Sequence, residues 1–212
     1  IANKLGEIPL AFQPGDQYAY GTSADILGAI IEKVSGQRFG DFLEDEVFKP
    51  LGMNDTAFYV TEQKQKRLAE IYESMENNAL QTYKGNHLGI VHAPHKSPAF
   101  ESGGAGLFST IDDYAKFTDM LMNGGKSGNI RFLKERTVSF FRSQGLDEYQ
   151  MRYFRNWHTL AGFTYGNLMR VMIHPDLAGG LSCKGEYGWD GWLGCYFTNC
   201  PEEQLTILIM MQ

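Results

Sequence analysis

The chain has 212 residues, which suffices for one large domain or for two lobes that share a core. Hydrophobic residues make up 43% and aromatic residues 13% of it, so the composition predicts a packed globular protein and excludes a disordered one. The net charge of -6 comes without a long basic run, which argues against nucleic acid as a main partner, and no apolar run reaches the roughly 18 residues of a membrane span.

The first strongly periodic stretch predicts a helix that begins after Thr22. Thr22 is expected to be its N-cap, with Asp25 completing a capping box, and Gly36 is expected to end it. The apolar residues of this helix recur at helical spacing and are expected to form a buried stripe: Ile26, Leu27, Ile30, Ile31 and Val34.

Four further helices follow from the apolar pattern. They are predicted over residues 40–48, 62–72, 111–122 and 133–143. Pro50 is expected to end the first of them, and Ser109 with Asp112 is expected to form a capping box for the third. Residues 73–100 are polar and without clear period, so they are interpreted as a loop that borders a site.

After about residue 160 the hydrophobic period changes from helical to alternating, which is typical of strands. Strands are predicted over 168–173, 187–192, 193–198 and 205–211, the last one buried on both faces. Helices followed by consecutive strands with short turns predict an α+β fold with an antiparallel sheet. We expect a helical lobe over 1–158 and the C-terminal strands of an α/β lobe over 159–212.

Two groups of residues are weighed as cross-links or metal ligands. The odd count of cysteines (Cys183, Cys195 and Cys200) and the lack of a CxxC pair favour buried free thiols over a disulfide framework or a zinc site. Three histidines (His87, His92 and His95) cluster in the polar loop, but their spacing matches no familiar ligand pattern and favours exposed loop histidines. We therefore predict no metal and no cofactor, and keep a metallohydrolase only as a remote alternative.

Separated blocks of the sequence resemble one known superfamily. The blocks are Phe12-x-Pro14-Gly15-x-x-Tyr18-x-Tyr20, Leu27-Gly28-x-Ile30-Ile31-x-x-Val34-Ser35-Gly36, Pro50-Leu51-Gly52-Met53-x-x-Thr56, Gly103-Gly104-x-Gly106-Leu107-x-Ser109-Thr110-x-x-Asp113 and Tyr187-Gly188-Trp189-Asp190-Gly191-Trp192. In this order they are similar to the serine β-lactamases and penicillin-binding proteins, in the class C β-lactamase-like branch that includes family VIII carboxylesterases and D-peptidases. The resemblance covers nearly the whole chain. It implies a β-lactamase/transpeptidase-like fold, with a helical lobe and an antiparallel sheet flanked by helices.

The resemblance implies three catalytic motifs and a role for each. Tyr20-Gly21-Thr22 matches the second, Tyr-x-Asn, so Tyr20 is expected to shuttle a proton. Trp189-Asp190-Gly191 matches the third, Lys-Thr-Gly, only at its glycine. The substrate-binding residues would then be Thr22, Trp189, Asp190 and Gly191, and the backbone N–H of Trp192 would be an oxyanion donor. Structural alternatives stay open: Tyr20 as an anchor of the helix start, Thr22 as a cap, and Gly191 as a strand bulge.

The first motif, Ser-x-x-Lys, is absent, because no serine in the chain is followed by lysine at the third position. By family order it would precede Ile1, so the chain is expected to be the C-terminal part of a larger hydrolase, inactive without the N-terminal segment that is its partner. A free tyrosine has a pKa near 10, so only about 0.1% is phenolate at pH 7, and ionisation at neutrality takes on the order of 4 kcal/mol. Lysines supply this in the superfamily, and Trp189 stands where one of them would be.

The substrate class stays open between an ester, a β-lactam and a D-amino-acid or peptidoglycan-like peptide. A carboxylate at Asp190 is a poor receptor for the carboxylate of a β-lactam, which favours neutral esters or amides or a substrate with a cationic end. The alternative from another class is a non-catalytic penicillin-recognition-like binding or sensor module. Trp157, His158 and Tyr165 are further candidates for lining the pocket where the two lobes meet, and the sequence does not rank them. The sequence also carries no signal that fixes a compartment.

Overall fold

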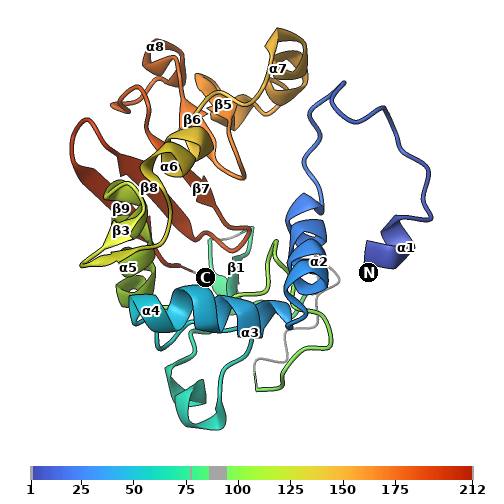
Figure 1. Cartoon of the computed structure of the whole chain (residues 1–212), viewed down its shortest axis with the longest axis vertical. Helices are drawn as coiled ribbons and strands as arrows, with labels where there is room; N and C mark the ends of the chain where they lie inside the picture. Colours follow the sequence, from blue (N-terminus) through green and yellow to red (C-terminus); the bar gives the residue numbers. More distant parts are fainter. Residues whose placement is uncertain (1, 77, 86–94, 212) are drawn as a thin grey trace.

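The computed structural model describes residues 2–76, 78–85 and 95–211 (Figure 1). The helices are α1 (Ala2–Leu5), α2 (Ser23–Ser35), α3 (Phe39–Leu43), η1 (Glu44–Phe48), α4 (Lys49–Leu51), η2 (Glu62–Arg67), α5 (Ile111–Met122), α6 (Glu135–Phe141), α7 (Glu148–Phe154), η3 (His158–Leu160) and α8 (Pro175–Ala178). The strands are β1 (Tyr72–Ser74), β2 (Leu80–Thr82), β3 (Lys126–Ser127), β4 (Ile130–Arg131), β5 (Phe163–Tyr165), β6 (Arg170–Met172), β7 (Tyr187–Asp190), β8 (Tyr196–Cys200) and β9 (Leu205–Ile209). No helix in these ranges has the length and apolar content to cross a bilayer.

The main sheet has five strands in the order β5-β6-β7-β8-β9, and every neighbouring pair is antiparallel. The strands are consecutive in the chain, so each pairs with the one before it through a short connection. Trp189 on β7 lies opposite Phe197 on β8. The predicted α+β fold with an antiparallel sheet is confirmed.

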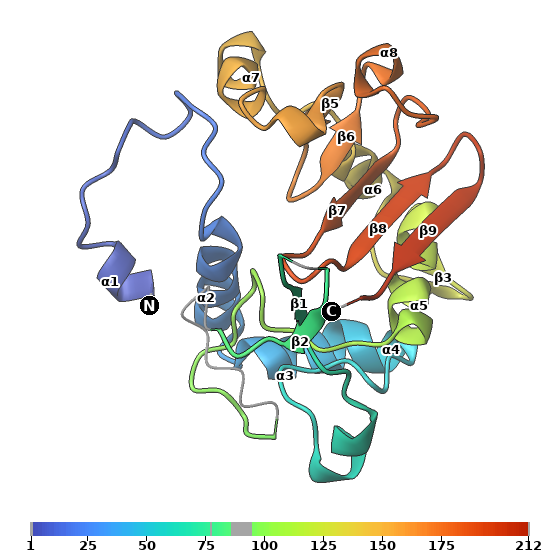
Figure 2. The same cartoon turned by 180° about the vertical axis from the view of Figure 1, so that it is seen from behind.

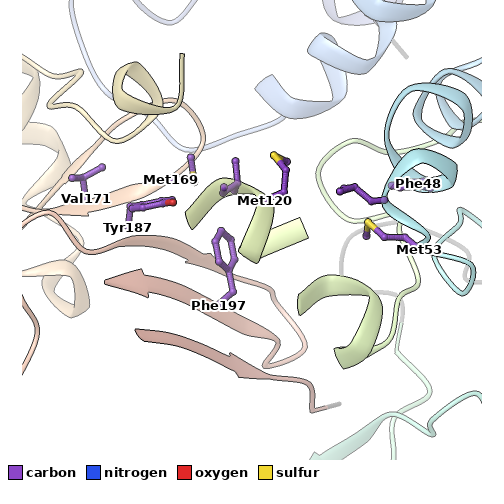
Figure 3. Close-up of a cluster of buried hydrophobic side chains, with 9 residues drawn as sticks. Phe48, Met53, Met120, Met169, Val171, Tyr187 and Phe197 are labelled. Carbon is purple, nitrogen blue, oxygen red and sulfur yellow. The ribbon is translucent and has the colours of Figure 1, made fainter. Parts of the chain in front are cut away.

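The hydrophobic core joins the sheet to the helical segment 39–53 (Figure 3). Phe48 and Met53 come from the helical segment, Met120 from α5, and Tyr187 and Phe197 from β7 and β8. α5 contacts both β8 and β9, so it covers one face of the sheet. Trp189 on β7 packs against this core, so the strand that carries it is held by the helical segment and by α5.

The apolar stripe of α2 is exposed, so the prediction that it is buried is wrong. Ile26, Leu27, Ile30 and Val34 are all exposed. α2 stands at the side of the molecule between α1 and α3 (Figures 1 and 2), and its buried position is Gly28, which lies against the ring of Phe39. Helical periodicity identifies the apolar face of a helix but not what covers that face.

Both predicted capping boxes differ from the structure. Thr22 is the N-cap of α2, but its hydroxyl makes no capping hydrogen bond. Asp25 instead accepts a hydrogen bond of 2.6 Å from the hydroxyl of Ser102, which ties α2 to the glycine-rich loop. In α5 the cap is one residue later than predicted, because Thr110 accepts from the N–H of Asp113.

Other element boundaries also shift. Helical turns continue past Pro50 to Leu51, and Gly52 with φ of 69° ends them. The helix expected over 62–72 is the shorter 3-10 helix η2, which ends at Arg67. The expected loop 73–100 contains the hairpin of β1 and β2.

β9 is exposed on one face, so the prediction that it is buried on both is wrong. Every second residue points outward and is exposed: Leu205, Ile207, Ile209 and Met211. Leu208, between them, packs against the core. Figure 2 shows β9 at the outer edge of the sheet, with β8 on its inner side.

The sequence favoured free thiols for all three cysteines, and this prediction is wrong for two of them. Cys183 and Cys200 form a disulfide across 17 residues, with their Cα atoms 6.5 Å apart, while Cys195 is free. The antiparallel register places Tyr187 opposite Asn199, so the chain just before β7 lies beside the end of β8, where Cys200 is found. The pairing follows from strand register, which the spacing of cysteines alone does not reveal.

Candidate active site

Tyr20 lies at the end of a segment that two contacts anchor to α7 (Glu148–Phe154). The carbonyl of Gly15, in the turn at Pro14, accepts a hydrogen bond from the side chain of Gln150 on α7. The ring of Tyr18 packs edge-on against Phe154, with ring centroids 5.0 Å apart. Two residues later, Tyr20 emerges with 60% of its surface exposed. The phenol is thus presented to solvent from a fixed backbone.

Three aromatic rings meet at Tyr20, and we call Tyr20, Trp157 and Trp189 the aromatic wall. The ring of Tyr20 stacks on Trp189 with centroids 5.7 Å apart and an interplanar angle of 23°. The ring of Trp157 stands edge-on to both, 5.1 Å from Tyr20 and 5.8 Å from Trp189. The structure therefore brings a residue of the second motif into contact with a residue of the third, although 169 positions separate them in the numbering.

Two further tyrosines stand behind the aromatic wall. Tyr165 on β5 packs against Trp189 at 5.4 Å and against Tyr18 at 5.0 Å. Burial raises the pKa of Tyr165 to about 12, and the nearby phenol of Tyr20 adds to the shift. Burial likewise raises the pKa of Tyr18, whose hydroxyl has no hydrogen-bond partner among the described residues. These two phenols stay protonated at neutral pH.

Asp190, predicted to bind substrate, contacts a buried arginine. Its Oδ1 lies 3.4 Å from Nη1 of Arg170 on β6, which is only 2% exposed. The guanidinium also lies over the rings of Tyr196 at 4.6 Å and Phe163 at 5.5 Å. Neighbouring residues of a strand point to opposite faces, so Asp190 is directed away from the face on which Trp189 meets Tyr20. Its negative charge is balanced by Arg170.

Gly191 and Trp192 lie in the tight loop from β7 to β8 and not in a strand. The N–H of Gly191 donates to the carbonyl of Cys195 at 2.6 Å, and the N–H of Gly194 donates to Gly191 at 3.0 Å. The side chain of Trp192 is 64% exposed. Thr22 is exposed as well, and its hydroxyl is not occupied by helix capping.

The remote metal alternative has no support in the described ranges. Residues 2–76, 78–85 and 95–211 contain no group of three histidine, cysteine, aspartate or glutamate side chains that is arranged to hold a metal ion. His95 is described and exposed, whereas His87 and His92 lie outside the described residues.

Comparison with known proteins gives the family of this fold. The sequence profile of the family named Beta-lactamase matches residues 1–212, the whole chain. The chain belongs to the β-lactamase family. This agrees with the resemblance seen in the sequence and confirms the β-lactamase/transpeptidase-like fold.

Several known proteins are similar to the chain over nearly all of its length. Protein Rv1367c of Mycobacterium tuberculosis is 31% identical over 98% of this chain and 52% of its own length. An Escherichia coli K12 protein that carries the provisional name D-alanyl-D-alanine carboxypeptidase is 26% identical over 95% of this chain and 46% of its own length. The solved structure of EstCE1, a hydrolase with promiscuous acyltransferase activity, superposes with a TM-score of 0.83 at 23% identity, covering 98% of this chain and 54% of its own. The chain spans about half the length of the curated relatives it matches.

Sequence reasoning alone did not rank two residues that shape this β-lactamase-family site. Trp157 and Tyr165 were both candidates for a pocket wall, together with His158, and the structure brings the first two to Tyr20 and Trp189. His158 is exposed. The sequence did contain one signal that could have helped to place Trp157. Asp147 and Gln150 have the spacing of a capping box, and in the structure they form one at the start of α7, the helix that Trp157 follows.

Proposed function

We propose that the chain is the part of a β-lactamase-like serine hydrolase that supplies the catalytic tyrosine and one wall of the substrate site. The observation that carries the proposal is the stacking of Tyr20, from the second motif, on Trp189, from the third, at 5.7 Å. Both motifs are incomplete when taken singly. Their contact supports a common site, because unrelated surface aromatics have no reason to converge from opposite ends of the chain.

In this proposal the reaction passes through an acyl-enzyme. A serine oxygen from a further segment of the protein attacks the carbonyl carbon of an ester or amide, and its proton passes to the hydroxyl of Tyr20 and on to the leaving group. Water then attacks the acyl carbon, the bond between that carbon and the serine oxygen breaks, and a proton of the water passes through Tyr20 to the serine oxygen as the acid product leaves. The backbone N–H of Trp192 donates to the oxyanion in both steps, and one such donor contributes about 10²–10³ in rate.

The 212-residue chain is proposed to be inactive by itself, because it has no Ser-x-x-Lys sequence to supply the nucleophile. Two uncovered apolar surfaces support a further segment of the same polypeptide as its partner. One is the stripe of α2 at Ile26 and Ile30, and the other is the outward row of β9 at Leu205 and Ile207. Contiguous exposed apolar surface of this kind marks a site where something else packs.

The charges at the site support a neutral ester or amide as substrate. Asp190 stands where the superfamily motif has threonine, and Trp189 stands where it has lysine. Neither residue offers the cation that a β-lactam carboxylate would need, and the guanidinium of Arg170 is buried and already paired. Efficient hydrolysis of a β-lactam such as nitrocefin by the full-length protein, unaffected by Asp190→Asn, would contradict this part of the proposal.

The test uses the full-length protein and a fluorophosphonate probe, which labels an activated serine. We expect one covalent adduct by intact mass, on a serine of an upstream Ser-x-x-Lys sequence. Tyr20→Phe should lower kcat/KM for an ester by about 10²–10⁴. Tyr72→Phe is the matched control, because Tyr72 is also an exposed tyrosine but lies on β1. Absence of both an adduct and an upstream Ser-x-x-Lys would instead identify a non-catalytic recognition module.

A further inference from the structure

We propose that the aromatic wall selects substrates with a neutral aromatic group beside the scissile carbonyl, and that Trp157 is the specificity-determining residue. The inference rests on the proposed function and deepens it from an open set of esters and amides to one substrate class. It follows from how the three rings are packed, from the charges around them, and from the place of Trp157 in the chain.

The aromatic wall is a packed surface and not an open cage. Its three ring centroids lie between 5.1 and 5.8 Å apart, which is direct ring contact. A ligand therefore has no space between the rings and must lie against their outer side. Tyr20 is 60% exposed there, so aromatic carbon faces the position that its hydroxyl serves. Flat apolar groups fit such a surface by stacking or edge-on contact.

The ion pair that Asp190, the residue after Trp189, forms with Arg170 favours neither an anionic nor a cationic substrate. Arg170 is 2% exposed, lies over two aromatic rings and is paired with Asp190 on the other face of β7. A substrate carboxylate could not form an ion pair with Arg170 without competing with Asp190. A substrate cation would find the carboxylate of Asp190 already neutralised, and on the other face of β7. A neutral group is therefore favoured, because it gives up no charge hydration when it binds to the aromatic wall.

Trp157 differs from the other two rings of the aromatic wall in what it can affect. Tyr20 carries the proposed proton transfer, and Trp189 lies in the strand that lines the site. Trp157 follows α7, just before η3, and reaches the site only through its ring contacts. A change at Trp157 should therefore act on the substrate's aromatic group and not on the hydroxyl of Tyr20.

The chain carries its own reporter for this proposal. It contains three tryptophans, and two of them, Trp157 and Trp189, belong to the aromatic wall. The probes are N-benzylacetamide, benzylammonium and phenylacetate, which share one ring and are neutral, cationic and anionic. Titration of the 212-residue chain should change its tryptophan fluorescence with N-benzylacetamide at lower concentration than with either charged probe. Equal or tighter binding of a charged probe would overturn the inference.

Variants at Trp157 separate aromatic recognition from a general loss of packing. Trp157→Leu should weaken N-benzylacetamide binding about 2- to 10-fold, and Trp157→Phe should keep most of it. Trp189, which stacks on Tyr20, still reports in both variants. Phe140→Ala, at an exposed aromatic residue of α6, is the control and should change nothing. Far-UV circular dichroism checks that each variant is folded. Unchanged affinity in Trp157→Leu would show that Trp157 has no part in recognition.

Two outcomes separate the failure of this inference from the failure of the proposed function. If the full-length protein is labelled by the fluorophosphonate but hydrolyses benzoate and butyrate esters with the same relative kcat/KM before and after Trp157→Leu, the inference fails and the hydrolase stands. If N-benzylacetamide binds as described but no serine is labelled, the aromatic surface stands and the hydrolase proposal fails. We expect labelling together with a fall in the benzoate-to-butyrate ratio, again about 2- to 10-fold.

Discussion

Two glycines of β7 and the loop that follows it have opposite structural roles, and alanine substitutions should separate them. A Cβ at Gly188 would lie 2.0 Å from the carbonyl oxygen of Phe197 and 2.8 Å from the Cα of Thr198. A Cβ at Gly191 would meet nothing closer than the Cβ of Cys195 at 3.5 Å. Gly188 is therefore required for β7 and β8 to approach, whereas the described structure leaves room for a side chain at Gly191.

The expected effects differ in sign. In Gly188→Ala the strands must separate by about 1.4 Å to reach the ordinary contact of 3.4 Å. Overpacking typically costs 1–3 kcal/mol, and backbone obstacles place this case near about 3 kcal/mol. Gly191→Ala should be neutral or stabilise by about 0.4–1 kcal/mol, because alanine restricts the unfolded chain. Urea unfolding followed by far-UV circular dichroism measures both, and the first variant should also lower Tm by roughly 6–12 °C.

The same pair tests the proposed role of Gly191. If Gly191 allows a substrate to approach β7 closely, Gly191→Ala in the full-length protein should lower kcat/KM while stability is kept. Equal loss of stability in Gly188→Ala and Gly191→Ala would refute the reasoning, because it would show that Gly191 is needed by the fold itself.

Three further outcomes are expected. Cys183→Ser removes a cross-link spanning 17 residues and should lower the free energy of unfolding by about 3 kcal/mol. Cys195→Ser is the control and should leave that free energy unchanged. Titration of three free thiols in the unfolded, unreduced chain would contradict the disulfide. Burial raises the pKa of Tyr165 to about 12, so its contribution to stability is complete below about pH 10 and is lost as the pH rises to about 12. Tyr165→Phe should therefore flatten the fall of the urea midpoint between about pH 9 and about pH 12. Ile30→Gln, on the exposed stripe of α2, should change the unfolding free energy of the 212-residue chain by less than about 0.5 kcal/mol, and a loss well above 1 kcal/mol would show that the stripe is covered.

Local chemistry was enough to predict the order of elements and the kind of sheet. The switch from helical to alternating period near residue 160 indicated consecutive antiparallel strands, and β5 to β9 are arranged in that way. The end of α2 at Gly36 follows from the need for a left-handed residue there, with φ of 74°. Such features depend on a few neighbouring residues, which a sequence displays directly.

Features that depend on distant partners were not predictable. The stripe containing Ile30 has the right period, but period does not say whether another surface covers it. Asp190 was weighed as a substrate residue from its place in the third motif, and nothing in the sequence pairs it with Arg170, 20 positions earlier. Trp157 could not be ranked for the same reason. Its contact with Tyr20 joins two segments that only the folded core brings together.

The open edge of β9 has a consequence for handling the protein. β9 is the last strand of the sheet, and its outward residues Leu205, Ile207 and Ile209 are apolar and exposed. An unprotected edge of this kind offers backbone donors and acceptors to a strand of another molecule. The isolated 212-residue chain should therefore self-associate as its concentration rises, and Ile207→Lys should restore a monomer in sedimentation velocity. The solubility of the separate chain would then depend on this strand and not on Tyr20, the proposed proton shuttle.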